Sequence, residues 1–401
     1  MNSARVAVIG HVDHGKSTLI GRLLYDSARI SDDRVAEIDA MVDALRSRFE
    51  FAYFLDSLEE EVAQARTIDT VSVRLQGARD YTIVDVPGHA CFVRNMLTGA
   101  ASADAAVLVV SVVEGVEEQT RRHLWLARMV GVRRMVVAIN KMDAAGWQEA
   151  AFRAREAEVL GLLGGGGAGT VPVVPVSATT GANVVRASAE SPWYAGPTVL
   201  EALDAADLAR PAGPTRVVVQ GGFDHDGGTV WFARVASGQV AVGDVLAFEP
   251  SGVVAAVTGL HEWGRAPVAA AEGDAIAFSC AGVLSRGDVG GPVASPPRAC
   301  RAFRAEAVVV EGTLGAGDGF ELRCGTSAVA CTIEAVEAVF SSETGEPLPG
   351  APAVVRELEA AVLRVVTPPV VVEPFAASPS LGRFVLGRAG RAVAAGVVLG
   401  T

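Results

Sequence analysis

Residues 10–18 form a pattern that could bind phosphate groups. They read Gly-His-Val-Asp-His-Gly-Lys-Ser-Thr and fit G-x-x-x-x-G-K-[ST], between a strand-like apolar run and a helix-like pattern. Lys16 would place its charge on the β and γ oxygens of a nucleotide, and the Ser17 hydroxyl would bind Mg²⁺. The helix that begins here directs its positive end at the phosphates. The sequence therefore predicts a nucleotide site formed by Gly10, Asp13, His14, Gly15, Lys16, Ser17 and Thr18.

A second motif, Asp85-Val86-Pro87-Gly88, lies at the end of the strand-like run at residues 81–85. In a nucleotide-binding sheet, Asp85 would reach Mg²⁺ through water. The Gly88 N–H would contact the γ-phosphate and so sense its hydrolysis. D-x-x-G is a weak motif alone, but its position about 70 residues after the phosphate loop makes it informative.

A third motif, Asn140-Lys141-Met142-Asp143, ends another strand. The Asp143 carboxylate can accept hydrogen bonds from N1–H and the 2-amino group of guanine, a donor pair that adenine lacks. The Lys141 stem can cover the face of the base. Ser177 and Ala178, after a further strand, would complete the base site through backbone contacts. The predicted ligands are therefore GTP and GDP with Mg²⁺.

The cations of the chain support these motifs. Only Lys16 and Lys141 are lysines, against 32 arginines, and both lie inside the nucleotide motifs. A compact ammonium and a planar guanidinium are not interchangeable at a tight phosphate or base site. Lysine is therefore expected to be chemically required at these two positions.

The strand-like and helix-like segments around these motifs indicate three domains. Residues 1–210 alternate strand-like and helix-like segments, which is typical of a mostly parallel sheet with helices on both faces. With the nucleotide motifs, this predicts an α/β P-loop GTPase domain. After Pro211 the chain becomes rich in valine strands and glycine turns, with a second break near Pro296. Residues 214–297 and 302–401 each suit a β-barrel domain. The strands expected in the first domain are residues 5–9, 81–85, 105–111, 134–139 and 171–176.

Composition restricts the class of protein. The 401 residues carry a net charge of −12, which argues against nucleic acid as a partner, although a local basic patch can lie on an acidic protein. No apolar run reaches the roughly 20 residues of a membrane span, and the N-terminus shows no signal peptide. The five scattered cysteines form no CxxC pair, as expected of thiols in a reducing cytoplasm.

Together, the motifs resemble the translation-factor class of GTPases. Residues 51–70, Ser191-Pro192-Trp193-Tyr194 and Gly196-Pro197-Thr198 are similar to two members, elongation factor one alpha and the large GTP-binding subunit of bacterial sulfate adenylyltransferase. The resemblance implies a GTPase domain followed by two β-barrels. It implies that Thr67 holds Mg²⁺ when the γ-phosphate is present, and that His89 orients the attacking water. His89, Lys16 and Thr67 are the expected catalytic residues, and Ser17, Thr67 and Asp85 the expected metal ligands.

One position departs from the family pattern. The family reads Arg-Gly-Ile-Thr at the switch, whereas this chain reads Gln64-Ala65-Arg66-Thr67. The missing isoleucine normally helps a loop valine, here Val12, to screen the water site. Either Arg66 points to solvent or a partner and leaves the gate looser, or it turns inward and stabilises transition-state charge as an arginine finger. A third alternative is impaired activity.

Three functions remain open because the GTPase machinery is common to them. Thr120-Arg121-Arg122-His123 and the "ASGQV" and "PSG" stretches of the second domain resemble the sulfate-activating subunit. They favour coupling of GTP hydrolysis to adenosine phosphosulfate synthesis by a smaller catalytic sulfate adenylyltransferase subunit, the expected partner. The final strands, around Gly382 and Gly396, resemble elongation factor and favour delivery of aminoacyl-tRNA. A GTP-dependent switch without an enzyme partner is the third possibility.

Overall fold

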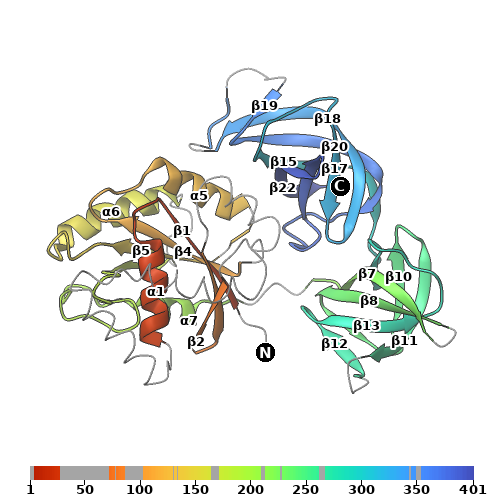
Figure 1. The fold of residues 1–401 in the computed structure, drawn as a ribbon, viewed down its shortest axis with the longest axis horizontal. Helices are drawn as coiled ribbons and strands as arrows, with labels where there is room; N and C mark the ends of the chain where they lie inside the picture. Colours follow the sequence, from red (N-terminus) through yellow and green to blue (C-terminus); the bar gives the residue numbers. More distant parts are fainter. Residues whose placement is uncertain are drawn as a thin grey trace. The chain divides into compact units, whose positions relative to one another are not determined.

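The computed structural model describes residues 4–27, 72–76, 78–85, 103–129, 131–132, 134–163, 171–208, 213–225, 228–261, 267–342, 345–348 and 354–401. The chain is divided into two compact units. The first comprises Met1–Arg128 and Val132–Ala209, and the second Met129–Gly131 and Arg210–Thr401. Figure 1 shows a helix-covered sheet in the first unit and strands alone in the second.

The first unit is built on a six-stranded sheet in the order β2-β3-β1-β4-β5-β6. All neighbouring strands run parallel except β2, which pairs antiparallel with β3 at the edge. Central strand β4 is buried at every residue, as expected of a strand covered on both faces. The strands are β1 (Ala4–Gly10), β2 (Ser72–Gln76), β3 (Asp80–Asp85), β4 (Ala105–Ser111), β5 (Arg134–Asn140) and β6 (Val173–Pro175).

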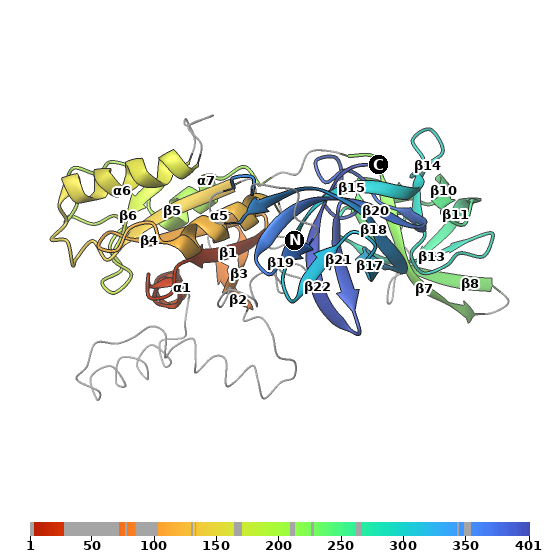
Figure 2. The same cartoon turned by 90° about the horizontal axis from the view of Figure 1, so that it is seen from above.

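Helices cover both faces of this sheet. Apolar residues of α1 (Lys16–Ser27) and α7 (Val199–Ala205) share one core with alternate residues of the strands, among them Val6, Val8 and Val107. The intervening strand residues are also buried, and α5 (Glu118–Met129) and α6 (Glu149–Leu162) lie over that side. Figures 1 and 2 show α5 and α6 on the opposite side of the sheet from α1.

The second unit holds two closed barrels. The first has the strand order β10-β11-β13-β8-β7-β14, and the second β15-β20-β18-β17-β21-β22. The first barrel and its small ribbon comprise β7 (Arg216–His225), β8 (Gly228–Ser237), β9 (Gln239–Ala241), β10 (Val245–Glu249), β11 (Val253–His261), β12 (Ala269–Ala271), β13 (Ala275–Cys280) and β14 (Val289–Pro292). The second comprises β15 (Ala299–Val309), β16 (Thr313–Gly315), β17 (Gly319–Cys324), β18 (Ser327–Ser341), β19 (Val354–Arg356), β20 (Glu359–Val371), β21 (Arg383–Arg388) and β22 (Arg391–Gly400).

Each barrel encloses its own apolar core, because side chains alternate inward and outward along the strands. β17 alternates exposed and buried residues over its whole length. A small cluster of Val218, Val289, Val371 and Leu381 packs between the barrels. The buried Arg216 guanidinium also joins them by donating from Nε to Glu373 Oε1 at 2.6 Å.

The predicted fold class, an α/β P-loop GTPase domain followed by β-barrels, is confirmed. The five strands expected in the first domain are all present, with ends that differ by at most two residues. β2 was not predicted. Within the described part of the chain, no helix has both the length and the apolar character that a membrane crossing requires.

Candidate guanine-nucleotide site

The phosphate loop connects the end of β1 to the start of α1 and requires glycine at two points. A Cβ on Gly10, whose φ is +144°, would lie 2.3 Å from the Val109 carbonyl oxygen. A Cβ on Gly15, with φ +88°, would lie 2.4 Å from Asn140 Nδ2. Both contacts are with neighbouring strand ends, so the loop can take this close path only without side chains at these positions.

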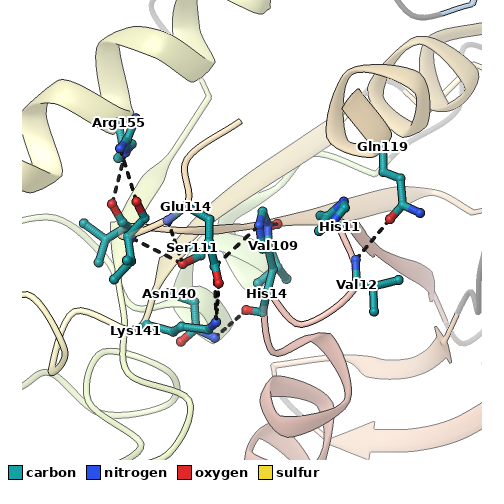
Figure 3. Close-up of polar contacts among 12 residues, drawn as sticks. His11, Val12, His14, Val109, Ser111, Glu114, Gln119, Asn140, Lys141 and Arg155 are labelled. Atoms are coloured by element: carbon teal, nitrogen blue, oxygen red, sulfur yellow. Dashed lines mark hydrogen bonds and ion pairs between the residues drawn. The ribbon is translucent and has the colours of Figure 1, made fainter. Parts of the chain in front are cut away.

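Side chains of α5 accept hydrogen bonds from the backbone of the phosphate loop, and Lys16 makes a further bond within the loop (Figure 3). The Gly10 N–H donates to His123 Nδ1 at 3.3 Å, and the Val12 N–H donates to Gln119 Oε1 at 3.1 Å. Lys16 Nζ donates to the His11 carbonyl at 2.7 Å. The ammonium is therefore directed back over the loop that precedes it. Ser17 and Thr18 follow in the first turn of α1, both partly exposed.

The predicted base motif lies beside this loop. The buried Asn140 side chain donates from Nδ2 to the His14 carbonyl at 2.8 Å, and its Oδ1 accepts the Ala178 N–H at 2.9 Å. One amide therefore joins the phosphate loop to the turn at Ser177 and Ala178. Asp143, three residues beyond Asn140, is exposed. The structure brings Gly10, Asp13, His14, Gly15, Lys16, Ser17, Thr18, Asn140, Lys141, Asp143, Ser177 and Ala178 to one edge of the sheet.

His14 is fully buried at the centre of the site. Its Nδ1 lies 3.4 Å from the Val109 carbonyl oxygen, its Nε2 lies 3.7 Å from Glu114 Oε2, and its ring centroid is 5.1 Å from that of His11. Burial lowers the pKa of His14 below its usual value, and this effect exceeds the opposing influence of the Val109 carbonyl and of Glu114. The imidazole is therefore neutral at pH 7.

The residues present fit a magnesium ion. Ser17 is the second residue of α1, and the backbone of Asp85 ends β3, where it pairs with Val8 of β1. A serine hydroxyl and an aspartate carboxylate are hard oxygen ligands of the kind Mg²⁺ prefers, so these two residue types suit the ion. Thr67, the third expected ligand, lies outside the described residues, as do Arg66, Gly88 and His89.

Sequence reasoning missed four residues that support the site, namely Glu114, Gln119, His123 and Arg155. Of these, only His123 lies in the stretch whose sequence resembles the sulfate-activating subunit. The contacts of His123 and Gln119 with Gly10 and Val12 give both residues a role in holding the phosphate loop. The signal that could have found these residues is the spacing of Gln119 and His123, four apart on one helical face.

Known proteins match nearly the whole chain. The model of the elongation factor Tu GTP binding domain matches residues 1–208, and that of the GTP-eEF1A C-terminal domain-like family matches residues 302–399. The elongation factor 1-alpha of Methanothrix thermoacetophila is 40% identical, that of Archaeoglobus fulgidus 39% and that of Thermococcus sibiricus 38%. Each alignment covers 98% of this chain and 96% of the relative.

These relatives correct the partner predicted from the sequence. The expected smaller catalytic subunit of sulfate adenylyltransferase is wrong, because the three relatives above, each aligned over 98% of this chain, are named elongation factor 1-alpha. The argument from acidity against nucleic acid is wrong with it, since a net charge of −12 is a sum over the chain and does not describe any one surface.

The GTP-binding domain, the glycine-dependent phosphate loop and the end-to-end identity lead to one assignment. The chain binds GTP and GDP and belongs to the EF-Tu/EF1A family of translation-factor-class GTPases.

Proposed function

We propose that this chain acts in translation elongation, as a GTP-dependent carrier of aminoacyl-tRNA. The observation that carries the proposal is the 38–40% identity to proteins named elongation factor 1-alpha, over 98% of this chain. The C-terminal match to the eEF1A-like family supports it, because this match lies outside the GTP-binding domain. Translation takes place in the cytoplasm, in agreement with the location expected from the sequence.

In this proposal, residues 1–210 are the nucleotide-binding domain, and residues 214–297 and 302–401 are two barrel domains. Barrel strands run from Arg216 to Pro292 and from Ala299 to Gly400, which supports the division. The nucleotide state of the first domain would determine whether the chain retains its cargo.

The site residues have separate roles in this cycle. Lys16 binds the β- and γ-phosphates. Asp143 selects guanine because its carboxylate accepts hydrogen bonds from the N1–H and 2-amino groups of the base. Bound Mg²⁺ would neutralise charge that develops between the β- and γ-phosphates, with Ser17, Thr67 and Asp85 as its ligands. His89 orients the attacking water, and Gly88 contacts the γ-phosphate through its N–H.

Protection of the aminoacyl ester tests the proposal. The full chain is mixed with aminoacyl-tRNA and either GTP or GDP, and spontaneous ester hydrolysis is followed over time. We expect slower hydrolysis with GTP than with GDP. Equal hydrolysis with GTP, with GDP and without protein would contradict the carrier function.

An Asp143→Asn variant is the matched control. Its carboxamide can donate to the 2-oxo group of xanthine. The variant should therefore slow hydrolysis of the aminoacyl ester with XTP and not with GTP. Protection that still requires GTP in this variant would mean that the site described above is not the one that controls the cargo.

A further inference from the structure

Glu114 connects the phosphate loop to the base motif, although neither motif contains it. Both oxygens of its carboxylate lie 3.2 Å from Lys141 Nζ, and Oε2 lies 3.7 Å from Nε2 of the buried His14 (Figure 3). Lys141 belongs to the predicted base site and His14 to the phosphate loop. One carboxylate therefore contacts side chains from both halves of the nucleotide site.

The turn that carries Glu114 is held by contacts from two directions. The Ser111 hydroxyl, at the end of β4, accepts the N–H groups of Val113 and Glu114 at 3.3 Å each. From α6, Arg155 donates from Nε to the Val112 carbonyl at 3.0 Å and from Nη2 to the Val113 carbonyl at 3.4 Å. The turn therefore has a defined conformation and presents the carboxylate in a fixed direction.

Gly115 allows Arg155 to reach this turn. Its φ is +80°, and a Cβ at this position would lie 2.5 Å from Arg155 Nη1. Glycine is thus needed both for the left-handed backbone and for the space that the guanidinium occupies. Arg155 is itself oriented by Glu158, which accepts from Nη1 at 2.8 Å.

The Lys141 side chain is flexible and is oriented here by Glu114, a residue from a separate turn. Lys141 follows the last residue of β5 with φ +64°, and its side chain is only 33% exposed. A flexible four-carbon stem can adopt many rotamers, and holding it over a base costs conformational entropy. An ion pair to a rigid turn reduces that cost by selecting one direction for the stem before the base arrives.

We propose that Glu114 is a positioning residue for guanine-nucleotide binding, which fixes Lys141 over the base. The proposal rests on the assignment of Lys141 to the base site. Hydrogen bonding with Ser111, and then with Lys141, lowers the pKa of Glu114, so the carboxylate is ionised at neutral pH. Glu114 acts through Lys141, and its loss should weaken contacts with the base more than contacts with the phosphates.

Release of GDP with a fluorescent ribose label from the full chain tests this. Glu114→Gln keeps the shape of the side chain but removes its charge. We expect release to be about fivefold faster, the effect of an ion pair worth roughly 1 kcal/mol at a partly exposed site. Glu117→Gln, a neutral replacement in the same connection between β4 and α5, is the control and should release GDP at the wild-type rate.

A double-mutant cycle shows whether the effect passes through Lys141. Lys141→Met removes the ammonium but keeps an unbranched apolar side chain. In that background, Glu114→Gln should change the release rate by less than about 1.5-fold, because the charge that Glu114 positions is gone. Competition by tripolyphosphate, which has no base, should be the same for Glu114→Gln and the wild type.

Three results would overturn the proposal: wild-type release by Glu114→Gln, an undiminished fivefold effect in Lys141→Met, or an equal loss of tripolyphosphate affinity. The last would place the action of Glu114 at His14 and the phosphate loop. Thermal unfolding of each variant identifies any that fails to fold, and Glu114→Ala, which also removes the charge, then replaces Glu114→Gln in the same cycle. The assays use no tRNA, so failure of the carrier function would leave their outcome unchanged.

Discussion

At the scale of single residues, Asn140 determines how the nucleotide site is assembled. Its amide donates to the His14 carbonyl and accepts from the Ala178 N–H, so it uses both of its polar atoms on different loops. An aspartate could not donate to His14, and an aliphatic residue could do neither. The Asn140 side chain therefore has a structural role, whereas in the proposed function Lys141 and Asp143 beside it contact the base.

His14 should make stability depend on pH. Because burial lowers its pKa in the folded state, the unfolded chain binds a proton that the folded chain does not when pH falls below about 6.5. The free energy of unfolding should therefore fall as pH decreases from 7 toward the folded-state pKa, by up to about 1.4 kcal/mol per pH unit. Above pH 7 this contribution is constant.

Urea denaturation at pH 7.5 and 5.5, without added nucleotide, measures this effect. His14→Gln removes the titrating group, so its unfolding free energy should fall less between the two pH values than that of the wild type. Equal losses in the two proteins would show that His14 does not contribute to the acid sensitivity.

Arg66 allows a prediction about hydrolysis, although it lies outside the described residues. If it points to solvent or a partner, the apolar gate with Val12 is missing, and Arg66→Ile would restore it. We expect single-turnover GTP hydrolysis by Arg66→Ile to be unchanged or faster. A rate reduced by a factor of about 10³ or more would instead indicate an arginine finger.

At the scale of elements, one buried ion pair joins the two barrels. Arg216 is 5% exposed and Glu373 15% exposed, and Arg216 Nη1 also donates to the carbonyls of Thr215 and Ser295 at 2.9 Å each. Arg216→Ala would leave a buried carboxylate without its cation, at a cost of roughly 3–5 kcal/mol. When chemical denaturation of the full chain is monitored by circular dichroism, the unfolding midpoint of this variant should lie at a lower denaturant concentration than that of the wild type.

Arg304 provides the matched control on the second barrel. It pairs with Glu337 at 2.6 Å, but its side chain is 57% exposed. Exposed pairs contribute at most about 1 kcal/mol, so Arg304→Ala should shift the transition far less than Arg216→Ala. Similar shifts for the two variants would contradict the role assigned to burial.

At the scale of the whole molecule, the number of cations in residues 302–401 should limit how strongly salt affects the proposed tRNA complex. These residues contain 7 arginines, no lysine and 11 acidic residues. They therefore offer at most seven cations that could displace counterions from phosphates. We expect the slope of log K against log salt for GTP-dependent aminoacyl-tRNA binding to be no steeper than about −3. A steeper slope would indicate a local basic surface that the overall charge conceals.

The local sequence was sufficient for much of the GTPase domain. Residues 10–18 have their loop conformation because Gly10 and Gly15 take backbone angles and close contacts that other residues resist. The chemically important residues could be located because parallel strands bring their carboxyl ends to one edge, so a polar motif after each buried strand predicts a shared site. The nucleotide could be inferred from Asp143, because its carboxylate can accept from the two donors that distinguish guanine from adenine.

Edge strand β2 was missed for a physical reason. It has one partner, β3, and runs antiparallel to it. A five-residue edge strand with one neighbour does not need the continuous apolar run that marks a buried parallel strand. Its sequence, Ser-Val-Arg-Leu-Gln, is therefore a weaker signal than that of β4.

The amino-acid sequence was enough to identify the chemical groups of the site: a phosphate loop, a guanine motif and the chain's two lysines. The folded structure was needed to see how these parts are held, because Gln119, His123, Glu114 and Arg155 contact residues far away in the chain. Such contacts depend on which side of α5 or α6 faces the sheet edge. Local motifs encode backbone conformation and chemical groups, whereas the packing of the complete sheet and its helices brings distant side chains together.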